Sequence, residues 1–163
     1  MLTDVHAVKD EMIRILKSAT PEYLPNIKFV QATSLAKLQE QTFGSAVEAT
    51  RRFQVWHGPL GGERGATYGV VNDGLLIDLV DYMVVTVRYG LFDDTAWDGF
   101  DRMTAYDQHY ILWLLNAANS ETWQIPSPHK WQPTGGISLT ETTGGHRGGI
   151  LRIPFQFALH VGR

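Results

Sequence analysis

One segment near the C-terminal end, Ile150–Val161, constrains the fold of this chain most strongly. Every odd position from 151 to 161 holds a large apolar residue, and the even positions from 152 to 160 hold polar residues, alanine or proline. A period of two predicts a strand with one buried face and one face toward solvent. Because proline cannot donate a hydrogen bond to a neighbouring strand, Pro154 predicts a sheet edge or a bulge at that position.

Three further segments are predicted strands. Asp78–Tyr89 is the longest, and β-branched and aromatic residues dominate it. Arg51–His57 alternates in the same way, and Ile137–Thr142 precedes a glycine-rich turn at Thr143–Gly149. That turn predicts a hairpin between Ile137–Thr142 and the final strand.

Two segments are predicted amphipathic helices, at residues 3–19 and 100–118. The first has apolar residues at steps of three and four, can be capped by Thr3 or Asp4, and ends before Pro21. In the second, we expect a stripe with Tyr110, Trp113 and Leu114 to pack on the sheet.

Four other segments have less regular sequence patterns. Ile27–Val30 fits a short strand, and Ser34–Gln41 fits one or two helical turns. Gly58–Gly74 contains six glycines and is predicted to be a long loop that becomes ordered against a neighbouring subunit. Residues 121–136 contain three prolines and are predicted to be a rigid, extended connector.

These elements predict an α+β fold in a single domain spanning residues 1–163. The expected architecture is a mostly antiparallel sheet with two helices packed on one face and a long Gly-rich loop. The N-terminal helix spans residues 3–19, and the core of sheet and helix spans about 50–161. A chain of 163 residues lies within the usual range of roughly 100–200 residues for one domain.

Composition argues against several classes of function. The chain has no cysteine, which excludes disulfides, thiolate metal sites and cysteine nucleophiles. Its net charge of −3 argues against a domain that grips nucleic acid through the phosphate backbone. No segment approaches 18 consecutive apolar residues, and the first residues lack the pattern of a signal peptide, so no membrane contact is expected.

The residue patterns predict no catalytic residues, no cofactor and no bound metal. The six histidines show no metal-ligand spacing, no serine lies in a Gly-x-Ser-x-Gly sequence, and the glycine-rich stretches lack a P-loop. Asp107 and His109 are two positions apart on a predicted helix, so we expect a solvated surface there. Asp78 and Asp81 are predicted to point to opposite faces of their strand.

Four features occur in a distinctive order between about residues 50 and 161. The first is a strand that begins with charged residues and then alternates, and the second is a central strand that ends in Val-x-Tyr. The third is a helix in which an aspartate precedes spaced aliphatic residues, and the fourth is a final apolar strand. The residues are Arg51–Val55, Asp81–Tyr89, Met103–Asp107 with Ile111 and Leu115, and Leu151–Val161 with Ile153–Phe155. This order resembles tail terminator (tail completion) proteins of long-tailed bacteriophages.

The resemblance implies a structural, non-enzymatic virion protein made in the host cytoplasm. It would form a hexameric ring at the neck, where the tail meets the head, and would end the tail tube. Its partners would be other copies of itself, the tail-tube protein and the head-side connector or adaptor. DNA would pass transiently through the lumen without sequence-specific binding. The alternatives are a head-closure adaptor, a tail-tube subunit, or a small ligand-binding or enzymatic α+β domain.

A closed ring of identical subunits needs two different contact surfaces on each subunit. We expect these surfaces at Gly58–Gly74 and at Thr143–Gly149, because both segments project beyond the predicted sheet. The candidate interface residues are Leu60, Arg64, Tyr68, Val70, His146 and Arg147.

Overall fold

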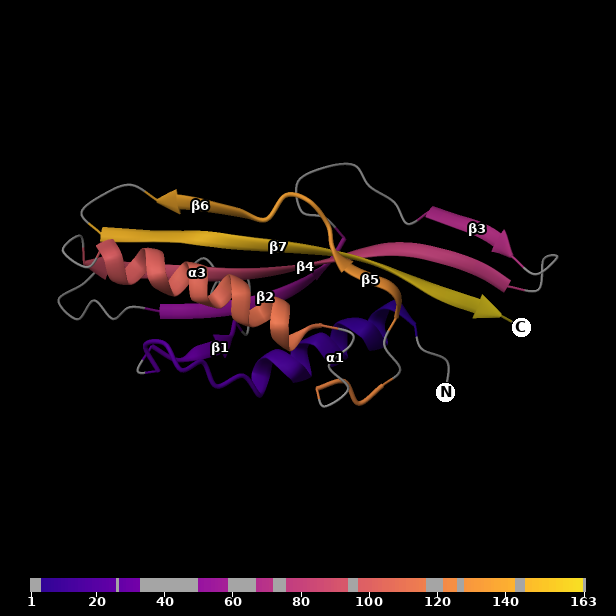
Figure 1. Ribbon diagram of the computed structural model, residues 1–163, viewed down its shortest axis with the longest axis horizontal. Coiled ribbons are helices and arrows are strands. Elements are labelled where there is room, and N and C mark those ends of the chain that lie inside the picture. Colours follow the sequence, from indigo (N-terminus) through magenta and orange to yellow (C-terminus); the bar gives the residue numbers. More distant parts are fainter. Residues whose placement is uncertain are drawn as a thin grey trace.

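One sheet and two helices make up the described part of the chain (Figure 1). The computed structural model describes residues 4–25, 27–32, 50–58, 67–71, 76–93, 97–116, 122–125, 128–142 and 146–162. In chain order the elements are α1 (Val5–Lys17), β1 (Phe29–Gln31), β2 (Thr50–His57), β3 (Thr67–Val71), β4 (Leu76–Asp93), α3 (Trp97–Leu114), β5 (His129–Pro133), β6 (Ser138–Thr142) and β7 (His146–Gly162).

The two longest strands, β4 and β7, lie side by side at the centre of the sheet and run antiparallel. β2 and β3 both pair with the edge of β4 that faces away from β7. β5 and β6 both pair with the edge of β7 that faces away from β4. β1 adds a short parallel strand beside β2. The other described pairs are antiparallel, so the predicted α+β fold with a mostly antiparallel sheet is confirmed.

The first helix, α1, agrees with the prediction. Asp4 Oδ1 accepts a hydrogen bond from Ala7 N at 2.7 Å and so satisfies a free N–H group of the first turn. The helix ends at Lys17, ahead of Pro21. Its buried apolar stripe packs over β1 and β2 and consists of Val8, Met12, Ile15 and Leu16.

The second helix, α3, buries only part of the predicted stripe. Leu114 lies in the core and Tyr110 is half-buried against it, whereas Trp113 is 56% exposed. The prediction was also wrong for Asp107, which was expected at a solvated surface but is buried beside Arg51 and Tyr89. The buried stripe of α3 and the residue after it consists of Phe100, Met103, Thr104, Asp107, Ile111, Leu114 and Leu115.

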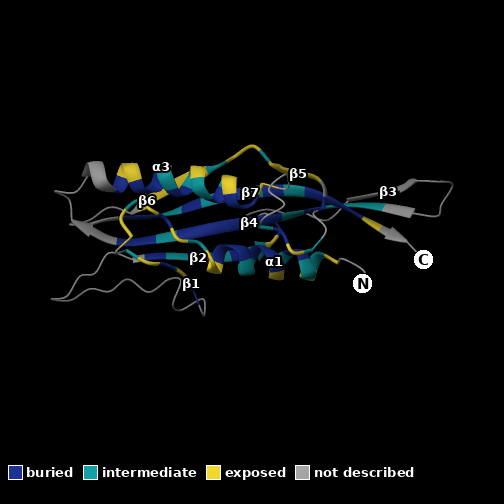
Figure 2. Cartoon of the chain, turned by 60° about the horizontal axis from the view of Figure 1, so that its bottom comes forward, coloured by how far each residue is buried: buried dark blue, intermediate teal, exposed yellow. Residues whose placement is uncertain are grey.

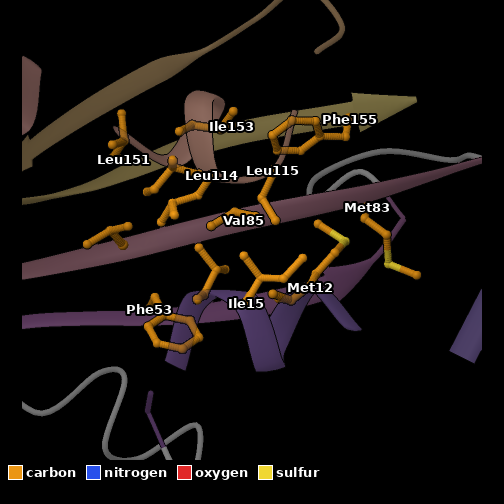
Figure 3. Packing of buried hydrophobic residues seen from close by; sticks show 14 of the residues in the cluster. Met12, Ile15, Phe53, Met83, Val85, Leu114, Leu115, Leu151, Ile153 and Phe155 are labelled. Atoms are coloured by element: carbon orange, nitrogen blue, oxygen red, sulfur yellow. The ribbon is translucent and has the colours of Figure 1, made fainter. Parts of the chain in front are cut away.

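The core fills the space between the two helices and one face of the sheet (Figures 2 and 3). Odd-numbered residues of the long strands point toward the helices, as the alternation predicts. The strand register places Val85 between Val55 and Ile153, and these three side chains are buried together. The odd positions Phe53, Met83, Val87, Leu151, Phe155 and Phe157 extend the same buried layer.

Two segments that were predicted without regular structure contain strands. β3 lies within Gly58–Gly74 and pairs with residues 76–80 of β4, while residues 59–66 and 72–75 lie outside the described residues. β5 lies within the predicted connector 121–136 and pairs with β7. β3 forms a hairpin with the start of β4, and the glycines of this segment hid its strand pattern. β5 pairs with β7 about 25 residues further along the chain, and a local pattern does not reveal this partner.

Several predicted bounds also shift. The strand predicted at Asp78–Tyr89 is β4, which continues to Asp93, and the predicted turn Thr143–Gly149 is shorter because β7 begins at His146. The short strand expected at Ile27–Val30 is β1, and Ser34–Gln41 lies outside the described residues.

Pro154 lies where one side of β7 has no strand partner among the described residues, between β5 and β6, so the strand has a local edge there as predicted. It is opposite Val84 of β4, and its carbonyl accepts a hydrogen bond from Thr134 N at 3.0 Å. The nitrogen and carbonyl of one residue in an antiparallel strand point the same way. The Pro154 nitrogen therefore faces the gap between β5 and β6, and no hydrogen bond to β4 is lost.

A buried ion pair joins β2 to α3. Arg51 Nη1 donates to Asp107 Oδ1 at 2.7 Å, and the Tyr89 hydroxyl donates to Asp107 Oδ2 at 2.7 Å. All three side chains are buried, and the guanidinium of Arg51 is fully enclosed. Its remaining donors bind the backbone carbonyls of Tyr23, Leu24 and Ile27.

This network shifts the protonation of its members. Burial raises the pKa of the Asp107 carboxyl, and the charge of Arg51 lowers it. Burial also raises the pKa of the Tyr89 hydroxyl well above its usual value, and the negative charge of Asp107 adds to that rise. Tyr89 therefore keeps its proton in the folded protein at pH values where an exposed tyrosine ionises.

The first prediction concerns the core. We expect Phe157→Ala to destabilise the protein by about 3–5 kcal/mol, because it removes a fully buried ring and leaves a cavity. Gln156→Ala, on the opposite face of the same strand, should change the unfolding free energy by less than about 1 kcal/mol. Urea unfolding measures both. Equal effects from the two variants would contradict the assigned facing of β7.

The second prediction concerns the ion pair. We expect Arg51→Ala to lower the unfolding free energy by about 3–5 kcal/mol, because it leaves the Asp107 carboxylate buried without its cation. The neighbouring Arg52→Ala is the matched control and should have a much smaller effect, because Arg52 lies on the other face of β2 and is only half-buried. Similar losses in both variants would show that Asp107 does not depend on Arg51.

The third prediction concerns pH. Because the folded pKa of Tyr89 lies above the unfolded value near 10, the unfolded chain loses this proton first as the pH rises. Stability should then fall above about pH 10, with a contribution from Tyr89 of up to about 1.4 kcal/mol per pH unit. Tyr89→Phe removes this contribution, so the stability gap between wild type and variant should narrow from pH 9 to pH 11. A constant gap in urea unfolding across that range would refute the assignment.

Candidate functional site

The described candidate interface residues lie at two opposite ends of β4. Tyr68 and Val70 belong to β3, where they pair with Leu79 and Ile77. His146 and Arg147 begin β7 and pair with Asp93 and Phe92 at the far end of β4. Leu60 and Arg64 lie outside the described residues. Since about 13 residues of β4 separate the two groups, they lie roughly 40 Å apart and form two surfaces rather than one site.

One of these surfaces is part of an extension of the sheet, which we call the arm. The arm consists of β3, residues 76–80 of β4 and residues 158–162 of β7, and it reaches beyond both helices (Figure 1). In the described part of the chain, β3 pairs only with β4, so its outer edge has no strand partner there. An edge of this kind presents backbone donors and acceptors to another chain.

A histidine and an aspartate form a pair on the helix-covered face, next to the base of the arm. His57 Nε2 lies 2.8 Å from Asp81 Oδ2, and Tyr82 N donates to Asp81 Oδ1 at 2.8 Å. Asp81 is almost fully buried, whereas half of the His57 side chain is exposed. The pair borders a cavity of about 360 Å³ that is lined by Val5, His6, Lys9, His57 and Met83.

The chemistry available in this cavity is limited. A buried carboxylate that holds an imidazole orients it for proton transfer. The lining residues supply a second histidine and a lysine, but no hydroxyl or thiol that the imidazole could activate. No local pattern predicts this pair, because His57 and Asp81 are 24 positions apart and only the register of β2 on β4 brings them together.

Asp78 and Asp81 do point to opposite faces of β4, as predicted. Asp78 lies on the face without helices, 3.3 Å from Lys130 Nζ and 3.6 Å from His160 Nε2. Asp81 faces the helices and pairs with His57. Two carboxylates on opposite faces of one strand cannot share a substrate.

The tryptophans divide between core and surface. Trp131 stacks on Phe155 with ring centroids 4.9 Å apart, and Trp123 is buried beside it. Trp113 is exposed at the end of a row of stacked rings that continues through Tyr110 and Tyr106. The side chain of Trp97 lies outside the described set. Trp113 is therefore the described tryptophan that is most available to a partner.

The described residues contain neither a membrane-spanning helix nor a cluster of metal ligands. Neither helix there is long and apolar enough to cross a membrane. No three histidine or acidic side chains of the described segments gather closely enough to hold a metal ion. Comparison with known proteins finds no matching family model and no matching curated protein.

Proposed function

We propose that this protein is a structural subunit of a closed ring, of the kind that tail terminator proteins form where a bacteriophage tail joins the head. The observation that carries the proposal is the arm. β4 has 18 residues and is about 60 Å long, whereas a compact domain of 163 residues would be only about 40 Å across. A strand longer than the domain leaves sheet that the chain's own helices do not cover.

The position of the arm supports a head-to-tail assembly. A ring that closes by rotation joins two different surfaces of neighbouring subunits. The arm would supply one such surface, and the far end of β4 with the start of β7 would supply the other. β3 also lacks the charged residues and proline that commonly protect an exposed edge from pairing with another chain.

In this proposal the protein acts without catalysis in the neck of the virion, after synthesis in the host cytoplasm. The ring ends the tail tube on one side and contacts the head-side connector or adaptor on the other. DNA passes through its lumen. A head-closure adaptor or a tail-tube subunit would use the same two surfaces, and a tube subunit would stack into open-ended filaments instead of a single ring.

One observation favours a different class of function. The cavity beside His57 and Asp81 would suit a small ligand-binding or enzymatic α+β domain, because a positioned imidazole lies at its edge. That protein would be a monomer or dimer in solution. Its mass therefore separates this alternative from the ring.

The fourth prediction tests the ring. Light scattering of the purified protein should give about six times the subunit mass of 18.3 kDa. Val70→Lys places a charge on β3 and should yield a folded monomer, because a charged edge resists strand pairing. Val30→Lys is the control, since Val30 is an exposed valine on a different edge strand, and it should assemble normally.

A second variant tests the same contact in case Val70→Lys fails to fold. Deleting residues 61–69 removes part of β3 and should also prevent ring formation while the melting transition persists. Rings of normal mass from both the deletion and Val70→Lys would contradict the role of the arm. A monomeric wild type with a ligand in the His57 cavity would contradict the ring itself.

A further inference from the structure

The cavity beside His57 lies where the N-terminal half of α1 meets the end of β2. Its described lining combines three side chains that can carry positive charge, His6, Lys9 and His57, with the apolar side chains of Val5 and Met83. The described lining includes no carboxylate. Its volume of about 360 Å³ is at the small end of the usual range for ligand pockets, roughly 300–1,000 Å³. The cavity therefore suits a compact ligand that offers hydrogen-bond acceptors to these donors.

Asp81 holds the His57 ring in one orientation at this cavity. The carboxylate is 3% exposed, and its Oδ2 lies 2.8 Å from His57 Nε2, whereas half of the His57 side chain is exposed. Because an ionised carboxylate only accepts hydrogen bonds, Nε2 carries the proton of this contact. In a protonated imidazole both nitrogens are donors. His57 can then donate from Nδ1 to a ligand while Nε2 stays on Asp81.

The charged groups around His57 come from α1 and β4. α1 contributes His6, Lys9 and Asp10, and β4 contributes Asp81. Each carboxylate is paired with an imidazole, Asp81 with His57 and Asp10 with His6, where Oδ2 and Nε2 lie 3.3 Å apart. Lys9 is half-buried and brings its ammonium to the wall of the cavity. The lining is therefore cationic, and the carboxylates support it from behind the imidazoles.

A second cavity of about 340 Å³ adjoins the first, because His6 and Lys9 line both. Gln54 and Trp56 also line it, and their side-chain nitrogens donate to acceptors of the protein itself. The charged group of a ligand is thus expected in the first cavity, and the second gives room for an uncharged remainder.

We propose that the cavity beside His57 binds a small ligand through an anionic oxygen group, either a phosphate or a carboxylate. The group would accept hydrogen bonds from Lys9 Nζ and from Nδ1 of protonated His57, and charged donors form the strongest hydrogen bonds to such oxygens. An apolar part of the ligand would lie against Val5 and Met83. The proposal goes beyond ring formation and does not rest on it. The mass of the particle tests the ring, and ligand binding tests the cavity, so each can fail alone.

The fifth prediction is that small anions bind in this cavity. The probes are sodium sulfate, which represents a phosphate group and keeps its charge near neutral pH, and sodium acetate. Each is added to the full chain with ¹³C-labelled methionine methyl groups. Both should shift the NMR signal of the Met83 methyl group with a Kd of roughly 0.1–10 mM, because two charge-assisted hydrogen bonds form. The signal of Met103, in the core on α3, should stay in place. The tighter probe identifies the preferred group.

Matched variants test Lys9. Lys9→Gln should weaken sulfate binding about 10-fold, because one charge-assisted hydrogen bond is lost. Lys17→Gln removes the same charge from the exposed end of the same helix and should leave binding unchanged. Unchanged Met103 signals in each variant would show that the core is intact.

The pH dependence tests His57. Wild type should bind sulfate about 10-fold more tightly at pH 5.5 than at pH 7.5, since histidine is the side chain that ordinarily gains charge in this interval. His57→Gln should remove the difference. His6→Gln and His109→Gln should keep it, because His6 is largely exposed beside Asp10 and His109 is exposed on α3.

Three results would overturn the proposal. The first is a Met83 signal that neither salt shifts at about 100 mM, well above the expected Kd. The second is methylammonium chloride that binds as tightly as acetate, because the cavity would then not select anions. The third is a pH difference that disappears in His6→Gln and persists in His57→Gln, because the pair of His57 and Asp81 would then have no part in binding.

Discussion

The ion pair between Arg51 and Asp107 is the contact on which the arrangement of the layers depends. A single guanidinium binds the carboxylate of α3 and three carbonyls of the segment that follows α1. That segment includes Leu24, whose φ of 49° is unfavourable for a residue with a Cβ. The hydrogen bond from Arg51 to the Leu24 carbonyl offsets this strain, because a buried cation needs every acceptor within reach. The sheet, the second helix and the segment after the first helix therefore meet at one side chain.

The alternation of the strands then divides the chemistry of the molecule into two faces. One face is apolar apart from Arg51, Asp81 and a few others, and both helices cover it. The other face is polar and aromatic and has no helix over it in the described part of the chain (Figure 2). The helices bury the first face up to the arm. They do not cover the second, where Arg52 and Arg88 lie directly opposite each other.

Local patterns predicted the elements that carry their own signal. Periodicity was enough for α1, for the long strands and for the inward face of β7. It missed β3, whose glycines indicated a loop although the strand pairs with the next segment of the chain, and it missed β5, whose partner on β7 is about 25 positions away. It placed Asp107 in solvent because no local pattern reveals a buried cation 56 positions away. The His57–Asp81 pair was unpredictable for the same reason, because it exists only once the register of β2 on β4 is known.

The proposed ring contact and the core occupy different parts of the same long strands. The arm begins at Val80, whereas the buried residues of β4 from Met83 to Tyr89 lie beneath the helices. A neighbour that paired with β3 would therefore add backbone hydrogen bonds without displacing any contact of the core. In the proposed assembly, the stability of each subunit would still come from its own core and from the ion pair between Arg51 and Asp107.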